Sequence, residues 1–301
     1  MTSEATVNTP ARAATAPVQV SFEFFPPKTA AMEANLWKAV RRLAPLGPRF
    51  VSVTYGADGS TRDRTHHIVT SIVRDTGLAS VPHLTCVGAT REEVLAIARR
   101  YWNEGIRQIV ALRGDPPAGQ ASYTPFPGGF AYANELVTGL KEVADFDISV
   151  AAYPDTHPEA ASPDHDIAML KRKFDAGASR AITQFFYDPD AYLRFRDRCV
   201  AAGITGPIVP GLLPINKFSQ MLAFASRCGA RVPAWLHQRF EGLDEDPETR
   251  QMIAASVAIE LVGRLRRHGV SEFHFYTLNR AELTYAICYA LGLRPREEVQ
   301  A

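Results

Sequence analysis

The stretch 81–113 reads VPHLTCVGATREEVLAIARRYWNEGIRQIVALR. Its two ends, 81–87 and 108–113, are short runs rich in β-branched and apolar residues, which predicts two strands. Between them, over 90–104, apolar residues recur every three or four positions while charged residues mostly take the other face. That spacing predicts an amphipathic helix. Two strands joined by a helix are typical of a parallel sheet, because parallel neighbours need a long crossover connection.

The same alternation continues along the chain in both directions. Thr90, with Glu93 three positions later, begins the helix as a capping box, and Gly105 follows the end of the helix as a C′ glycine does. Similar glycines stand just before later strands. In total we expect eight strands, at 18–25, 49–55, 81–87, 108–113, 147–153, 180–187, 207–213 and 272–278.

Eight strands, each followed by a helix through short connections, predict an α/β fold, a single (β/α)8 TIM barrel. An additional short helix, PAWLHQRFEGL at 233–243, precedes the long helix before the eighth strand. A doubly wound open sheet is the alternative, but its first strand usually leads into a Gly-rich turn, and here Phe24-Phe25-Pro26-Pro27 follows. We expect the barrel over 18–298 and a disordered tail, rich in Ala, Thr and Pro, over 1–17.

The composition excludes several classes of function. Lys and Arg number 33 and Asp and Glu 32, so the formal net charge of +1 provides no overall attraction to nucleic acid or to an anionic membrane. No apolar run reaches the roughly 18 residues that cross a bilayer. The four cysteines stand far apart without a C-x-x-C pair, which argues against a disulfide framework or a structural zinc site. We expect a cytoplasmic protein with no metal site.

Polar side chains at or just past the strand ends are the candidate site, because barrels of this type carry their reactive surface there. In SFEFF, alternation places Ser21 and Glu23 toward the barrel interior and Phe22 and Phe24 toward the helices. A carboxyl group in the interior is poorly solvated, which favours its protonated form and suits a general acid. From position alone, a Glu that pairs with an interior Arg or Lys for architecture is an equal alternative.

Other candidates each allow a structural alternative. Asp115 follows a strand and a flexible Arg-Gly, so it is either close to a ligand or a turn residue before two prolines. Gln184 lies in a buried strand, where a ligand with an amide-like edge would satisfy its amide. His83 and Phe224 are also compatible with core packing. The basic cluster at 171–173 would bind a phosphate or offset the helix dipole. No Rossmann or Walker A motif occurs.

Eight segments together resemble the bacterial methylenetetrahydrofolate reductase family, in the order of that family and over nearly everything from 18 to about 295. They are VSFEFFPPKT (20–29), FVSVTYGA (50–57), PHLTC (82–86), ALRGDPP (111–117), VAAYP (150–154), RAITQFF (180–186), VPGLLP (209–214) and HFYTLNRAE (274–282). The resemblance implies a barrel that binds FAD without a Rossmann fold. NADH or NADPH would reduce the FAD, and 5,10-methylenetetrahydrofolate would then be reduced to 5-methyltetrahydrofolate in a ping-pong mechanism that supplies methionine synthesis. By the same analogy the chain would form a homotetramer.

The resemblance also implies roles for single residues. Glu23 falls on the general acid that protonates the bridging nitrogen of the folate and opens its ring to an iminium. Asp115 falls on a carboxylate beside the flavin, whose fixed charge would favour that cation. Met169 stands where relatives commonly have Asn, and the loop 118–131 is longer than in relatives. The implied cofactor contacts are Thr54, His83, Arg113, Gly114, Asp115, Tyr132, Ala133, Tyr153, His157, Asp166, Arg172 and Lys173. The implied substrate contacts are Gln184, Gln220, Phe224, Tyr276, Leu278 and Arg280.

Two other functions remain open at this point. Another TIM-barrel flavin oxidoreductase, similar to proline dehydrogenase, would share the architecture without needing the Glu23 acid. A non-enzymatic protein that binds folate or flavin would keep the basic helix and Gln184 and would tolerate the loss of Glu23. The presence of Glu23, Asp115 and Gln184 in one chain favours the reductase.

Overall fold

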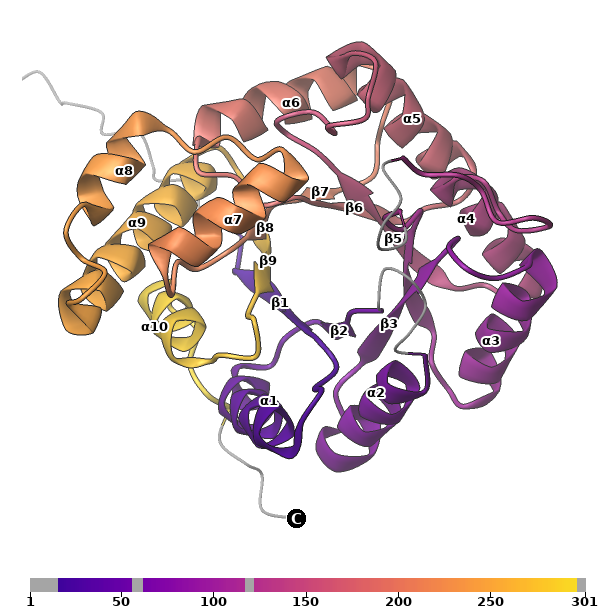
Figure 1. The fold of residues 1–301 in the computed structure, drawn as a ribbon, viewed down its shortest axis with the longest axis horizontal. Coiled ribbons are helices and arrows are strands. Elements are labelled where there is room, and N and C mark those ends of the chain that lie inside the picture. The colour runs from indigo at the N-terminus through magenta and orange to yellow at the C-terminus, as the bar shows by residue number, and fades with distance from the viewer. Residues whose placement is uncertain (1–15, 56–61, 117–121, 297–301) are drawn as a thin grey trace, which may run out of the picture.

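A parallel sheet forms the centre of the molecule, with helices around it, in the computed structural model, which describes residues 16–55, 62–116 and 122–296 (Figure 1). The strand order is β7-β6-β5-β4-β3-β2-β1-β9-β8, and the paired strands in the described part of the chain run parallel. The strands are β1 (Gln19–Phe24), β2 (Val51–Val53), β3 (Ser80–Thr85), β4 (Gln108–Leu112), β5 (Asp147–Ala152), β6 (Arg180–Thr183), β7 (Ile208–Val209), β8 (Gly211–Leu212) and β9 (Glu272–Tyr276).

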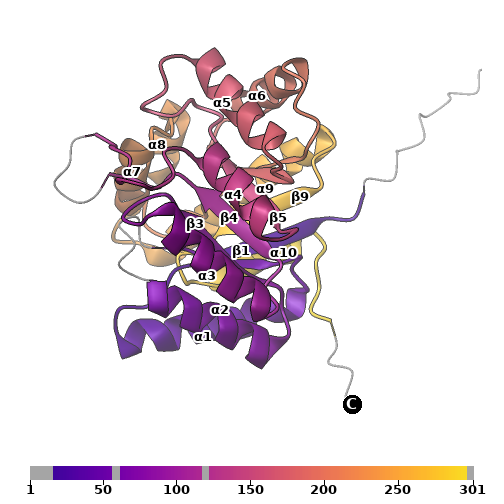
Figure 2. The ribbon, with the colours of Figure 1, turned by 90° about the vertical axis from the view of Figure 1, so that its right-hand side faces the viewer.

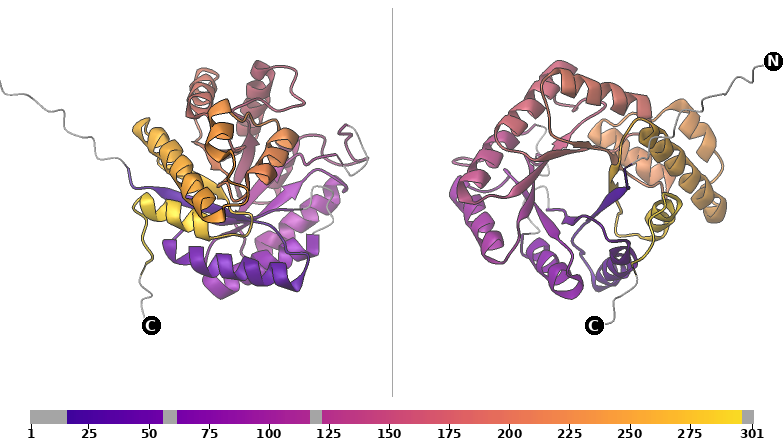
Figure 3. Two further views of the ribbon diagram at one scale, coloured as in Figure 1. Left: turned by 60° about the vertical axis from the view of Figure 1, so that its left-hand side comes forward. Right: turned by 180° about the vertical axis from the view of Figure 1, so that it is seen from behind.

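The helices form one layer outside the sheet (Figures 2 and 3). They are α1 (Ala30–Leu43), the 3-10 helix η1 (Ala44–Leu46), α2 (Arg62–Thr76), α3 (Arg91–Asn103), α4 (Ala133–Val143), α5 (Pro163–Asp175), α6 (Pro189–Ala201), α7 (Phe218–Cys228), α8 (Ala234–Phe240), α9 (Pro247–Arg267) and α10 (Glu282–Ala290). The expected (β/α)8 barrel and the additional helix before the last strand, which is α8, are confirmed.

The expected strand 207–213 is divided by Pro210 into β7 and β8. Proline has no N–H to donate to a ladder, and here the chain changes its partner: β7 pairs with β6, whereas β8 pairs with β9. The carbonyl of Pro210 accepts from His274 N at 3.0 Å, and Gly211 N donates to Thr183 Oγ1 at 2.9 Å. The two halves of one expected strand thereby join the two edges of the sheet and close the barrel.

Alternation along β1 sorts its residues as predicted. Val20, Phe22 and Phe24 face outward and belong to the main core, together with Leu36 and Val40 of α1. The other face points into the barrel, and the barrel interior contains a second and smaller core. Its buried members are Phe50, Val81, Val110, Ile182 and Val209.

The predicted capping box and C′ glycine of α3 are also confirmed. Thr90 and Glu93 form a capping box at the start of α3, and Gly105 after its end has a φ of +86°. The long helix α9 begins after Asp246, whose side chain accepts from Thr249 N. These contacts satisfy N–H groups that the first turn of a helix cannot pair.

Several expectations concern the chain ends, the cysteines and the membrane. Residues 1–15 of the expected tail, and 297–298 of the expected barrel range, lie outside the described residues.

Three cysteines are buried and Cys228 is half-buried, and burial raises the pKa of the Cys86 thiol to about 12. None of the helices in the described part of the chain is long and apolar enough to cross a membrane.

We predict that Gly211→Ala destabilises the barrel. A Cβ atom at this position would lie 2.0 Å from the Thr183 carbonyl oxygen, so the strands at the seam must separate. We expect a loss of about 3 kcal/mol or more in the free energy of unfolding, measured by urea denaturation. The matched control is Gly263→Ala in α9, where the nearest atom is 3.9 Å away and Ala gains up to about 1 kcal/mol. Equal stability of the two variants would contradict the seam described above.

Candidate functional site

Glu23 near the end of β1 points into the barrel, where it meets two imidazoles. Its Oε2 atom lies 3.4 Å from His83 Nε2 on β3 and 3.6 Å from His274 Nε2 on β9. The Glu23 side chain is 19% exposed, and the His274 side chain only 1%. Among the described residues, no Arg or Lys lies within ion-pair distance of Glu23, so the interpretation as half of an architectural Glu–Arg or Glu–Lys pair is wrong.

One of the two imidazoles beside Glu23, that of His83, favours its neutral form. Burial lowers the pKa of His83, and the nearby Glu23 carboxylate opposes this only in part. On the other side, Ser21 Oγ lies 2.7 Å from His274 Nδ1. When the Ser21 hydroxyl donates to Nδ1, the ring proton of His274 is on Nε2 and faces Glu23. The Nε2 atoms of both imidazoles thus face the Glu23 carboxyl group.

The end of β9 supplies three of the expected substrate contacts. Tyr276 reaches past the divided seventh strand to β6, where its hydroxyl donates to the Thr183 carbonyl at 2.7 Å, and burial raises its pKa well above the ordinary value. Leu278 adopts a left-handed backbone with a φ of +50°. Arg280 is exposed. Tyr276 lies next to Glu23, whose charge also raises the tyrosine pKa, whereas Arg280 stands further out on the rim.

Charged side chains gather where β4 ends. The Arg113 guanidinium donates to Glu159 Oε2 at 2.5 Å and stacks 4.4 Å from the centre of the Tyr123 ring. Gly114 follows with a φ of +89°, a conformation that favours glycine, and Asp115 after it is exposed. Asp115 is therefore open to a ligand. Residues 117–121 of the loop that follows lie outside the described residues.

The end of β5 and helix α5 complete this group. The rings of Tyr153 and His157 meet edge to face at 4.6 Å, and His157 N donates to Asp166 Oδ2 at 2.9 Å. Lys173 donates from Nζ to the Ala151 carbonyl at 2.9 Å. Burial lowers the pKa of Lys173 to about 8, with the Arg113 charge acting in the same direction and Asp166 opposing. A half-buried ammonium bonded to a neutral carbonyl is a natural partner for an anionic ligand.

The remaining expected contacts are more scattered. Thr54 follows β2 and its N–H donates to the Phe24 carbonyl, next to Glu23. Gln184 follows β6, and its Oε1 accepts from Phe185 N at 3.0 Å. Four of the expected contacts that no described interaction joins to the rest are Arg172, Tyr132, Ala133 and Gln220, and of these only Ala133 is buried.

Helix α7 carries Gln220 and Phe224 at the end of the barrel where the strands finish (Figures 1 and 2). Phe224 is half-buried, and the Arg227 guanidinium lies 4.9 Å from its ring centre. The helix is tied to the β5 side, because Arg231 N after its end donates to Asp155 Oδ2 at 3.0 Å. A cofactor at β5 and a substrate at α7 would thus share one rim.

Sequence reasoning did not include His274 among the site residues, although the signal was present. The alternation that places Tyr276 in the interior also places His274 there, and the β1–β9 register pairs Ser21 with His274. Glu159 was missed as well, and nothing in the local pattern indicates its contact with Arg113. No group of three His, Cys, Asp or Glu in the described ranges could hold a metal ion.

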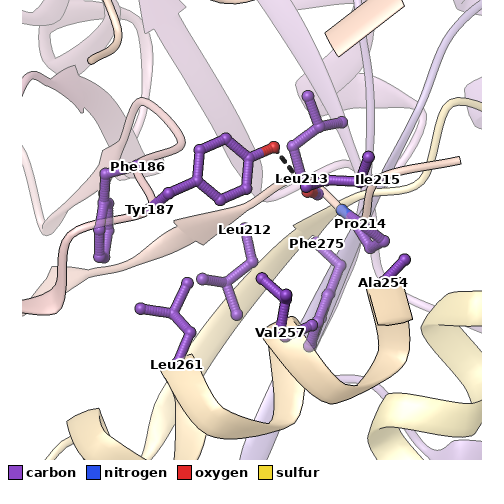
Figure 4. Close-up of a pocket in the computed structure, with 11 residues that line it drawn as sticks. Phe186, Tyr187, Leu212, Leu213, Pro214, Ile215, Ala254, Val257, Leu261 and Phe275 are labelled. Carbon is purple, nitrogen blue, oxygen red and sulfur yellow. Dashed lines mark hydrogen bonds between the residues drawn. The ribbon is translucent and has the colours of Figure 1, made fainter. Parts of the chain in front are cut away.

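A separate small pocket lies between β8 and α9, away from this rim (Figure 4). Its lining carries no charged side chain, and Tyr187 there donates its hydroxyl to the Leu213 carbonyl at 3.1 Å. The pocket is therefore a packing feature between the sheet and its outer helices.

Comparison with known proteins agrees with this geometry. A family model described as methylenetetrahydrofolate reductase matches residues 9–292. The chain belongs to the methylenetetrahydrofolate reductase family. It is similar to 5,10-methylenetetrahydrofolate reductase of Escherichia coli (strain K12), with 58% identity over 278 residues and 92% of each chain covered. Identity to the protein of the same name from Buchnera aphidicola subsp. Acyrthosiphon pisum is 49%, again over 92% of each chain.

Membership in the methylenetetrahydrofolate reductase family makes the chain an oxidoreductase. The two alternatives, a proline-dehydrogenase-like enzyme and a non-enzymatic binding protein, are thereby excluded. Arabidopsis thaliana "Methylenetetrahydrofolate reductase (NADH) 1" is 37% identical over 91% of this chain and 48% of its own length. Among solved structures, an uncharacterized protein from Clostridium thermocellum that binds two copies of 5-methyl-5,6,7,8-tetrahydrofolic acid has a TM-score of 0.60, 18% identity, and 92% and 93% coverage of the two chains. That likeness concerns the fold alone.

Proposed function

We propose that this chain reduces 5,10-methylenetetrahydrofolate to 5-methyltetrahydrofolate with electrons from NADH or NADPH, through bound FAD and a ping-pong mechanism. The observation that carries the proposal is the position of Glu23. Its partly buried carboxyl group lies between two imidazoles, on the same rim as Arg113 and Lys173. The names of the relatives support the substrate. We further propose a cytoplasmic homotetramer that supplies methyl groups for methionine synthesis, by analogy with the family.

The residues at the ends of β4 and β5 fit FAD. The pyrophosphate carries negative charge, and the half-buried Lys173 ammonium, with Arg113 and His157 nearby, would bind it through charge-assisted hydrogen bonds. Bound there, FAD would supply hydride transfer from the nicotinamide to the folate. Further contacts on the same rim would come from Thr54, His83, Gly114, Asp115, Tyr132, Ala133, Tyr153, Asp166 and Arg172.

Glu23 would act as the general acid. Protonated, it would donate to the bridging nitrogen of the folate, and ring opening would then produce a cationic iminium. Its neighbour His83 is buried, and because this burial lowers the histidine pKa, a neutral imidazole rather than a cation stands beside the carboxylate that remains. Asp115, fixed after Gly114 at the rim, would stabilise the cation by its negative charge.

Substrate recognition would use the far side of the rim. Gln184 has its Oε1 occupied by Phe185 N, which leaves its NH2 group to donate to the pterin. Phe224 on α7 would contact the folate and the nicotinamide in turn, and the exposed Arg280 would pair with the glutamate carboxylate of the folate. Gln220, Tyr276 and Leu278 would complete the pocket.

The proposed function predicts a characteristic absorption experiment. The purified protein, supplied with FAD, should be yellow, should lose this colour on anaerobic addition of NADH or NADPH, and should regain it on addition of methylenetetrahydrofolate. Loss of colour without recovery would overturn the folate assignment and leave a flavin enzyme. A protein that stays colourless after addition of FAD would overturn the cofactor assignment.

We predict that Glu23→Gln separates the two half-reactions. The side chain keeps its size but cannot deliver the proton, so the folate half-reaction should slow by at least about 100-fold while FAD binding and its reduction by NADH stay near the wild-type values. Stopped-flow absorption measures both steps. Glu104→Gln, at the end of α3 and paired with His66, removes a carboxylate far from the rim and is the control. Normal folate turnover in Glu23→Gln would remove Glu23 from its role.

We predict that FAD affinity falls above pH 8. Lys173, with a pKa of about 8, is already charged below this pH, whereas above it FAD binding must take up a proton. The dissociation constant should therefore rise by up to about tenfold per pH unit above pH 8, as measured by flavin fluorescence. Lys173→Met should bind FAD weakly and lose this dependence. The same pH dependence in Lys173→Met would show that another group causes it.

A further inference from the structure

Two consecutive residues after β9 adopt left-handed backbone conformations. Leu278 has a φ of +50° and Asn279 a φ of +56°, and neither is glycine. Such conformations cost a non-glycine residue about 1 kcal/mol or more each, so they persist only where surrounding contacts enforce them. The contacts that enforce this turn lead directly to the strand that carries Glu23.

Asn279 is bound on both sides of its amide to the backbone of Phe25. Its Oδ1 accepts from Phe25 N at 3.0 Å, and its Nδ2 donates to the Phe25 carbonyl at 2.9 Å. The regular ladder between β1 and β9 ends at the pair Glu23–Tyr276. The Asn279 side chain therefore continues the pairing of the two chain segments beyond the point where the strands stop, and it is itself buried.

Thr277 connects this amide to the backbone of Glu23 itself. Its hydroxyl donates to the Glu23 carbonyl at 2.6 Å, and its oxygen accepts from Asn279 N at 3.1 Å. Thr277 and Asn279, here called the rim clamp, alternate along the chain with the expected substrate contacts Tyr276 and Leu278. One set of side chains faces the substrate while the other holds the backbone on which the acid stands.

The chemistry of the contact requires an amide. Asn offers an acceptor and a donor that match the N–H and C=O of Phe25, whereas Asp offers only acceptors and would place a carboxylate oxygen against the Phe25 carbonyl. Asn also tolerates the left-handed region better than most residues. Both properties are needed at 279 together.

We propose that Asn279, with Thr277, is a positioning residue that fixes the Glu23 carboxyl relative to the substrate-binding turn at 276–280. The proposal rests on the proposed function, in which Glu23 is the acid for the folate step. Misplacement of a catalytic group by about 1 Å can cost about 100-fold in rate. Loss of the clamp therefore acts on the folate half-reaction and leaves reduction by NADH unaffected, because hydride delivery to the flavin does not use the Glu23 proton.

The test compares three substitutions at 279 in the full-length protein loaded with FAD. Asn279→Ala and Asn279→Asp should slow the folate half-reaction about 10- to 100-fold in its maximal rate rather than in folate affinity, and should move the pH midpoint of that step. Asn279→Gly is decisive, because glycine adopts the left-handed turn without strain but has no amide. It should be as slow as Asn279→Ala. A normal rate in Asn279→Gly would show that only backbone strain matters and would overturn the proposal.

A pair at Thr277 provides an independent test that keeps the shape of the side chain. Thr277→Val removes the hydroxyl and should slow the folate step, whereas Thr277→Ser keeps it and should restore the rate. Ser179→Ala is the matched control at the opposite end of the barrel, where Ser179 Oγ accepts from Ile148 N at 3.2 Å. It should lower stability and leave both half-reactions intact.

The outcomes separate this proposal from the function on which it rests. Equal slowing of the NADH and folate steps in the clamp variants would indicate a general structural role and would overturn the proposal alone, as would unchanged rates. A wild-type protein that NADH bleaches but folate does not reoxidise would overturn the proposed function, and the clamp proposal with it.

Discussion

At Gly211 the backbone of the divided seventh strand passes so close to the Thr183 carbonyl that a Cβ atom would lie 2.0 Å from its oxygen. Pro210 before it ends pairing with β6, and Gly211 begins pairing with β9. This close approach is what closes the sheet. Because the sheet closes, all of its strands finish at one rim, and residues on the two strands that flank the seventh, such as Thr183 on β6 and Tyr276 on β9, come within hydrogen-bonding distance.

Closure also creates an interior that can hold a carboxyl group. Glu23 stands above the small apolar core of the barrel and against two imidazoles, one of which has its pKa lowered by burial. A protonated Glu23 and a neutral His83 carry no charge, so the acid form of the site avoids the cost of burying ions. The charged groups of the rim lie elsewhere, around Arg113 and Lys173, where an anionic ligand would meet them.

The rim therefore has two parts with different electrostatics. The part formed by β4, β5 and α5 carries charged side chains, among them Arg113 and Lys173, and the part formed by β1, β3 and β9 holds the Glu23 carboxyl group beside the rings of His83 and His274. The helix α7 is joined to the first part through Asp155 and Arg231 N. Family membership assigns the chain to the oxidoreductases, and this division explains how one rim could hold an anionic cofactor and still protonate a substrate.

Local sequence patterns predicted most of the fold. The eight strands, the capping box at Thr90 and the inward direction of Glu23 all follow from interactions within a few residues, where propensity and alternation act. Strand ends were less accurate: 180–187 was expected, but β6 ends at Thr183, because Phe185 and Phe186 leave the ladder and pack in the main core. The change of pairing partner at Pro210 was not predicted. It depends on how the neighbouring strands are spaced, and the local sequence pattern does not give that spacing.

The candidate site divides in the same way. The sequence by itself determined which residue types stand at the strand ends, because a period of two is a local property of an extended chain. Only the tertiary structure decided what those residues meet. His274 and Ser21 are 253 positions apart, and Asn279 and Phe25 are 254 apart, yet each pair is in hydrogen-bonding contact. Such contacts arise when the first and last strands pair, and that pairing is a consequence of barrel closure rather than of any short stretch of chain.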